Sequence, residues 1–327
     1  MAERTSIHFR KRTLRVLLFL VLITGLAYVI YTGNERFAVL ATIWKNFHEA
    51  ERYPWLILSF LLMPVNWWLE AVKWQRVVKP VTTISILDAL SGVLSGVSFG
   101  LFTPHGIGDY VGRLLQLESQ ERLRTIGAVF ISRISQFMIT LLFGTIAFFH
   151  FITHTDYKYF QPEWLWSILF IAANLFMLFG FYEHAVIVRW LKKIPLLNRL
   201  YPYFEILQHY SLQETLILLG IAALRYIVFV LQFVALFLFF GVDYSWELMF
   251  AGVGMVFLAK SVIPTFFEIG VRELAVVVVF IAYTGIHDFR VEAALYASML
   301  LWIMNIIIPA IAGAGMIFRT KWMEEDL

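Results

Sequence analysis

The sequence predicts an all-α integral membrane protein, for two reasons: its composition and the length of its apolar stretches. Of its 327 residues 60% are hydrophobic, and the mean hydropathy is +0.76, whereas soluble domains are roughly 45–50% apolar. A spanning helix needs roughly 20 mostly apolar residues. Six stretches meet this requirement, at about Leu14–Tyr31, Pro54–Val72, Ile126–Phe151, Trp164–Tyr182, Leu212–Phe240 and Val291–Phe318.

Two further apolar stretches, Leu87–Phe102 and Leu248–Ile263, are shorter and rich in small residues. Each leads through a proline and a charged, glycine-containing turn into another apolar piece. Broken backbone at membrane depth is tolerated only where protein buries it or where it lines a cavity. We therefore expect two re-entrant helical hairpins. Gly92, Gly96 and Gly100 form an every-fourth-residue face on the first hairpin, which favours close helix packing.

The distribution of basic residues predicts the orientation of the chain. With a cytoplasmic N-terminus and six spans, most of the 26 lysines and arginines lie on the inner side. This is the expected positive-inside bias. We expect both termini to be cytoplasmic, in a bacterial inner membrane. The outer segments hold only Arg36, Lys45, Arg52, Lys158 and Arg290, and those near membrane depth are Arg113, Arg133, Arg225, Lys260 and Arg272.

The order of spans and hairpins predicts a single membrane domain, residues 1–327, with an internal repeat. The first unit covers about 54–151 and the second about 212–318; a linking span and an amphipathic linker occupy about 164–211. The hairpins, Leu87–Leu117 and Leu248–Tyr283, would enter from opposite sides. Inverted repeats of this kind occur in many secondary transporters, which bind substrate near the membrane midplane where the repeats meet.

The turn of the first hairpin carries charge at membrane depth. Pro104 cannot continue a helix, and Gly106 and Gly108 permit a sharp reversal. Asp109 and Arg113 are four residues apart, on one helical face. Arg113 and the free N–H groups of a helix start could hold a lipid phosphate; alternatively, the pair only stabilises the turn. The segment reads Thr103-Pro104-His105-Gly106-Ile107-Gly108-Asp109-Tyr110-Val111-Gly112-Arg113.

The turn of the second hairpin is acidic. Glu268 and Arg272 have the spacing of a helical ion pair, and Glu273 follows at once. These residues could bind a cation or a proton, or form a gate; alternatively, they are a charge cluster at the outer surface. The segment runs from Pro264 to Glu273 and includes Gly270.

Arg133 and Arg225 interrupt apolar spans, where arginine usually faces the bundle interior and pairs with an acid. The candidate partners are Asp109 and Glu273. Alternatively, Arg225 extends along the span to the inner surface.

Glu70 lies near the end of the second span and is a further candidate site residue. The pattern of Glu70 and Lys73 with Trp67, Trp68 and Trp74 favours an interfacial anchoring belt over a binding site.

Several functional classes are not expected. The chain has no cysteine, which excludes disulfides and thiolate chemistry. It has no phosphate-binding P-loop, nucleophile elbow or zinc-protease helix. His150 and His154 alone make a weak metal site. The net charge of +3 is small and fits membrane orientation rather than nucleic-acid binding. We expect no enzyme activity, no cofactor and no metal.

Taken in order, these motifs resemble the flippase-like, lysylphosphatidylglycerol-synthase transmembrane-region family over about residues 10–320. The resemblance implies an inverted-repeat fold and movement of a charged lipid or lipid-linked sugar between leaflets. Where the family usually carries Pro-Gly-Gly in the second motif, this chain has Phe266, Phe267 and Glu268. The matching residues are Thr103, Pro104, Gly106, Gly108, Asp109 and Arg133 in the first motif, and Pro264, Gly270 and Glu273 in the second.

Three functions follow from these observations. The first is a flippase for a charged phospholipid or a lipid-linked sugar or polyprenyl phosphate, whose partner is a lipid with an anionic or zwitterionic head group. The second is a non-transporting lipid-binding accessory of an envelope enzyme. The third is a membrane glycosyltransferase, for which Glu35, Glu49 and Glu51 are the only carboxylate cluster on an outer loop. Synthase activity is not expected, because the sequence has no counterpart of the soluble aminoacyl-transferase domain of fused members.

Overall fold

The computed structural model describes Thr24 and residues 50–103, 106–114, 117, 122–155, 162–263, 270–285, 288 and 290–317. Helix is the only regular secondary structure in these residues, so the predicted all-α class is confirmed. The α-helices are α3 (Tyr53–Val78), α4 (Ile86–Gly100), α5 (Gly108–Leu114), α6 (Ile126–His154), α7 (Glu163–Tyr182), α8 (His184–Lys193), α9 (Tyr201–Phe204), α10 (Leu212–Phe239), α11 (Trp246–Val262), α12 (Val271–Thr284), α13 (Arg290–Trp302) and α14 (Ile308–Ile317). The short helical turns are η1 (Ala50–Arg52), η3 (Leu123–Thr125), η5 (Asn198–Leu200), η6 (Glu205–His209) and the π-helical η7 (Ile303–Ile307).

Within the described residues, five helical segments are long and apolar enough to cross a membrane. They are α3, η3 with α6, α7, α10, and α13 continued through η7 into α14. They coincide with five of the six predicted spans, and the chain is an integral membrane protein. The first predicted span, Leu14–Tyr31, lies outside the described residues.

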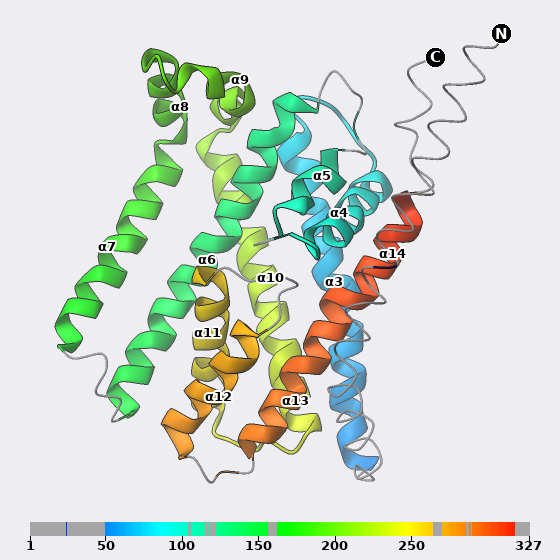
Figure 1. Cartoon of the computed structure of the whole chain (residues 1–327), viewed down its shortest axis with the longest axis vertical. Coiled ribbons are helices and arrows are strands. Elements are labelled where there is room, and N and C mark those ends of the chain that lie inside the picture. Colours follow the sequence, from blue (N-terminus) through cyan, green and yellow to red (C-terminus); the bar gives the residue numbers. More distant parts are fainter. Residues whose placement is uncertain are drawn as a thin grey trace.

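The shorter helices pack in opposite halves of the bundle (Figure 1). α4 and α5 lie in the half that also carries α8 and α9, whereas α11 and α12 lie in the other half. α10 packs along α3, and α14 packs on α4, so the N-terminal and C-terminal parts of the chain are interleaved.

Glycines bring α4 and α5 together. A Cβ on Gly112 of α5 would strike the backbone of Gly96 on α4, and one on Gly96 would strike the Asp109 carboxylate. α14 approaches α4 in the same way, because a Cβ on Gly313 would meet the Leu94 carbonyl. The backbones touch directly, as the every-fourth-residue glycine face predicts.

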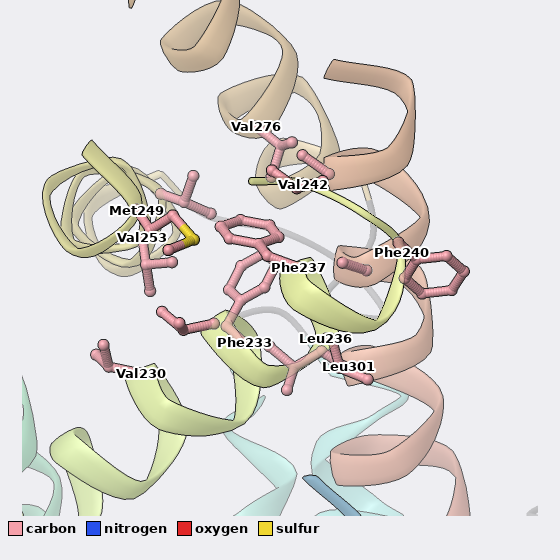
Figure 2. Close-up of a cluster of buried hydrophobic side chains, with 14 of the residues drawn as sticks. Val230, Phe233, Leu236, Phe237, Phe240, Val242, Met249, Val253, Val276 and Leu301 are labelled. Carbon is pink, nitrogen blue, oxygen red and sulfur yellow. The ribbon is translucent and has the colours of Figure 1, made fainter. Parts of the chain in front are cut away.

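An aromatic core joins α10 to the second pair of short helices (Figure 2). Phe233 and Phe237 of α10 point toward Met249 and Val253 of α11. Phe237 also meets Phe280 of α12 edge-on, with 5.3 Å between ring centroids. Edge-to-face pairs of this kind add to the stabilisation from burial. The core therefore fixes α11 and α12 on α10.

Among the described helices, α7 packs only lightly, against α6 and α10. Only 6% of the apolar window of α7 is buried by the rest of the chain. At the end of α7 the linker turns into α8, whose Trp190 is exposed, and Leu196 beyond it is 84% exposed. These apolar side chains stand among the basic residues of the predicted amphipathic linker.

Candidate functional site

Six charged side chains from four helices form one connected group, which we call the charge cluster. α3 contributes Glu70 and Lys73, α5 contributes Asp109 and Arg113, and α6 and α10 contribute Arg133 and Arg225. It lies where α5 meets α3, α6 and α10. The sequence predicted each member except Lys73 as a candidate site residue.

Glu70 is the hub of the charge cluster. Its Oε1 accepts from Arg113 Nη2 at 2.7 Å. Its Oε2 lies 2.9 Å from Lys73 Nζ and 2.9 Å from Arg225 Nη1. One carboxylate on α3 thus binds side chains of both α5 and α10. Its partner on α10, Arg225, lies 155 residues further along the chain (225 − 70).

Asp109 is the second acidic centre. Arg113 Nε donates to both of its oxygens at 2.9 Å. Arg133 Nη2 reaches Asp109 Oδ2 at 2.7 Å and also donates to the Gly106 carbonyl at 3.0 Å. Gly106 presents this carbonyl from a left-handed conformation with φ of +64°. Asp109 was one of the two candidate partners that the sequence offered for Arg133.

The turn before α5 is held by side-chain hydrogen bonds. Thr103 Oγ1 accepts from the Gly108 N–H at 2.6 Å and donates to the Gly100 carbonyl at 3.1 Å. The first amide of α5 is therefore taken by Thr103 and is not a free anion donor, contrary to the prediction from the helix start. Pro104 lies outside the described residues.

Cations outnumber carboxylates in the charge cluster. Among the described residues the cluster has four basic and two acidic groups, which leaves a net charge of 4 − 2 = +2. Lys73, Glu70, Asp109 and Arg113 have side chains at most 5% exposed. Arg133 differs, because its side chain is 40% exposed. The charge cluster is thus a buried cationic site with one accessible arginine at its edge.

Two tryptophan rings beside the charge cluster partly offset its excess positive charge. Trp74 lies 5.4 Å from the Arg113 guanidinium and Trp67 lies 5.3 Å from that of Arg225, within cation–π range. Arg113 Nη1 is nevertheless buried and has no hydrogen-bond acceptor among the described residues. Unpaired buried donors are costly and uncommon in native structures, so this one calls for an explanation.

An amide relay continues from the charge cluster into the C-terminal part of the chain. Arg225 Nε donates to Asn66 Oδ1 at 2.8 Å, and Asn66 Nδ2 donates to Asn305 Oδ1 at 3.1 Å. Asn305 sits in η7, a π-helical turn, and such turns occur frequently at functional sites. Sequence reasoning missed both asparagines; their position inside apolar spans was the available signal.

The interpretation of Glu70 and Lys73 as part of an interfacial belt is wrong. Glu70 and Lys73 do not belong to an interfacial belt, since the bundle buries both, together with Trp67 and Trp74; Trp68 alone of these tryptophans is exposed.

Arg225 does not extend to the surface, since its side chain is 11% exposed and pairs with Glu70. The proposed partner Glu273 is also wrong for Arg225 and Arg133, because Glu273 pairs elsewhere.

α12 carries a separate pair of charged residues. Arg272 Nη2 contacts Glu273 Oε1 at 2.5 Å, and its Nε donates to Ser298 of α13 at 2.8 Å. The Gly270 N–H donates to Glu273 Oε2 at 2.8 Å, from a backbone with φ of +99°. The pair is buried and neutral. Glu268 lies outside the described residues.

The histidine pair has no metal-site geometry. His150 Nδ1 lies 2.9 Å from the Tyr283 hydroxyl, and the rings of His150 and His154 stack at 4.1 Å. The part of the chain that the structure describes contains no group of three or more histidine or acidic residues suited to a metal ion.

Comparison with known proteins identifies the family. Residues 13–313 match the family model described as the lysylphosphatidylglycerol synthase TM region. The chain belongs to this family. The resemblance seen in the two motifs is confirmed, and the family connects the chain with membrane lipids. Searches of curated proteins and of solved structures found no significant match.

Proposed function

We propose that this family member is a flippase, which moves a charged phospholipid or a lipid-linked sugar or polyprenyl phosphate between leaflets. The observation that carries the proposal is the charge cluster, with its excess of buried cations and its accessible Arg133. A charged side chain at membrane depth costs on the order of 2.5–3.5 kcal/mol on insertion scales, so such residues are rare and usually functional. A transient anionic head group would compensate the excess charge.

Arginine suits this role. Its planar guanidinium binds phosphate in a bidentate manner. In the structure Arg133 donates hydrogen bonds from Nε and Nη2 to Asp109, and Nη2 also donates to the Gly106 carbonyl. A head group arriving at the exposed edge would exchange these contacts for phosphate oxygens. Asp109 then acts as a resting counter-ion that the substrate displaces.

We also propose the finer architecture: six spans, with re-entrant hairpins α4–α5 and α11–α12 entering from opposite sides. Their location in opposite halves of the bundle supports this arrangement (Figure 1). Because the chain has no cysteine, single cysteines test it directly.

With a cytoplasmic N-terminus, the proposed spans place Asp243 on the outer side of the membrane and Leu196 on the cytoplasmic side. Both side chains are exposed, that of Asp243 by 81%. An impermeant maleimide added to intact cells should label Asp243→Cys and spare Leu196→Cys. The reverse pattern would overturn the proposed orientation.

The function is tested by lipid movement in vesicles. Purified protein is reconstituted with fluorescent anionic, zwitterionic, aminoacylated and polyprenyl-phosphate lipids, and a membrane-impermeant quencher reports the outer-leaflet fraction. We expect faster movement of at least one class with the wild-type protein. Arg133→Gln should lose it, whereas Arg189→Gln, which changes an exposed arginine on α8, should retain it.

Two results would count against the proposal. If lipid movement between leaflets were unaffected by Arg133→Gln, the charge cluster would not take part in it. No movement of any lipid by folded wild-type protein would favour the accessory role, in which the charge cluster binds a lipid without moving it.

A further inference from the structure

We infer that the charge cluster selects a head group with two negative charges, that is, a terminal phosphate monoester. The inference rests on the proposed lipid-binding function and adds the class of ligand. Its basis is the combination of a net charge of +2 among the described residues with two guanidinium groups that meet at Asp109.

The sign and size of the charge discriminate between head groups. A phosphodiester lipid brings one negative charge and leaves one cation uncompensated. A zwitterionic head group leaves both uncompensated, and a lysylated phosphatidylglycerol, with two amino groups and one phosphate, adds positive charge to a site that is already cationic. A phosphate monoester carries −1.5 to −2 near neutral pH, roughly the charge that neutralises the cluster. Like-charge juxtaposition is a common means of rejecting a wrong ligand.

The donors also fit a terminal phosphate. Arg133 is the accessible donor, with its side chain 40% exposed. Arg113 binds the same carboxylate through Nε, and its Nη1 is a buried donor with no acceptor among the described residues. A monoester offers three terminal oxygens, so it can accept hydrogen bonds from several donors. A diester has two non-ester oxygens and shields them with a second ester substituent.

The neighbouring contacts keep Arg113 in place for this task. Its Nη2 is held by Glu70 at 2.7 Å and its Nε by Asp109 at 2.9 Å, while Trp74 covers one face of the guanidinium. Rotation of the Arg113 guanidinium is therefore restricted, and its Nη1 has a fixed orientation. A preorganised donor of this kind gives selectivity because little order is lost on binding.

The test measures which lipid stays bound to the purified protein. The protein in detergent is mixed with equimolar phosphatidic acid and phosphatidylglycerol, matched in acyl chains, and the adducts are counted by native mass spectrometry. We expect phosphatidic acid to exceed phosphatidylglycerol by about tenfold or more, which corresponds to 1.4 kcal/mol. Equal binding, or an excess of phosphatidylglycerol, would overturn the inference.

Variants at Arg133 separate charge from geometry. Arg133→Gln lowers the net charge of the cluster to +1, and the ratio should fall to within about threefold. Arg133→Lys keeps the charge but lacks the planar fork, so the preference should survive with less total lipid bound. Thermal unfolding of each variant confirms its fold. An unchanged ratio in a folded Arg133→Gln protein would contradict the inference.

Soluble competitors identify the source of the phosphate. Inorganic phosphate and glycerol 3-phosphate are added to the protein with phosphatidic acid bound. A lipid site predicts that neither displaces the lipid at equal concentration, whereas displacement would overturn the lipid assignment in favour of a soluble phosphate ester. Failure of this inference is distinguishable from failure of the proposed function: movement of phosphatidylglycerol but not phosphatidic acid refutes only the head-group class, and binding without movement refutes only the flippase.

Discussion

Removing the charge of Glu70 should destabilise the protein more than any other single change of charge in the charge cluster. The substitution Glu70→Gln keeps the shape and leaves Lys73, Arg113 and Arg225 without the carboxylate that they share. Breaking one buried ion pair by removing a partner costs about 3–5 kcal/mol. Three partners are stranded here, so we expect a loss at the upper end of that range or above it.

Such a loss is large beside the 5–15 kcal/mol of a typical folded domain. In thermal unfolding of the purified protein in detergent, a loss of about 5 kcal/mol corresponds to a midpoint lowered by roughly 10–20 °C, taking about 2–4 °C per kcal/mol. The matched control is Glu163→Gln at the exposed start of α7, which should stay within about 0.5 kcal/mol of the wild type.

A second substitution tests the mechanism of this loss. Adding Lys73→Met to Glu70→Gln removes one of the stranded cations, so the double variant should recover part of the stability. Coupling energies between contacting residues are about 0.5–3 kcal/mol. If Glu70→Gln behaved like Glu163→Gln, or if Lys73→Met gave no recovery, the reasoning about Glu70 as the hub would be refuted.

Two further predictions concern packing and pH. Gly112→Ala should lower the free energy of unfolding by about 1–3 kcal/mol or more, because its Cβ would strike the Gly96 backbone. The control Gly220→Ala, whose Cβ would meet nothing within 4 Å, should be neutral or stabilising by up to about 1 kcal/mol. Equal unfolding midpoints for the two variants would contradict this prediction. Hydrogen bonds from Arg290 lower the pKa of Asp288, in the loop before α13, to about 2. Its folded-state pKa is depressed, so its stabilisation is complete above the unfolded pKa and is lost as pH falls toward about 2. Asp288→Asn should therefore be less sensitive to acid in that window, and an unchanged pH profile of the unfolding midpoint would contradict it.

Local patterns in the sequence predicted much of the fold. Apolar length indicated five of the spans that the structure describes, and glycine spacing indicated the close packing of α4 on α5. Asp109 and Arg133 were recognisable because charge at membrane depth needs a partner. Each of these properties depends on a short window of sequence.

The burial of Glu70 could not be predicted in this way. A glutamate and a lysine beside tryptophans at a span end have the same local pattern whether they face the membrane interface or the bundle. The packing of α5 and α10 against α3 decides between these two environments, because it brings Arg113 and Arg225 into contact with Glu70. Those contacts join residues 43 and 155 positions away, and no periodicity encodes them. The Asn66–Asn305 bond was missed for the same reason.

The measurement that tests the central claim most directly is photocrosslinking of a bound lipid. Vesicles containing the wild-type protein and a phosphatidic acid with a diazirine next to its glycerol are irradiated, and adducts are mapped by mass spectrometry. A head group held in the charge cluster places adducts on α5 and on α6 near Arg133, and Arg133→Gln should remove them. Adducts confined to the exposed face of α7, and unchanged in Arg133→Gln, would contradict the account.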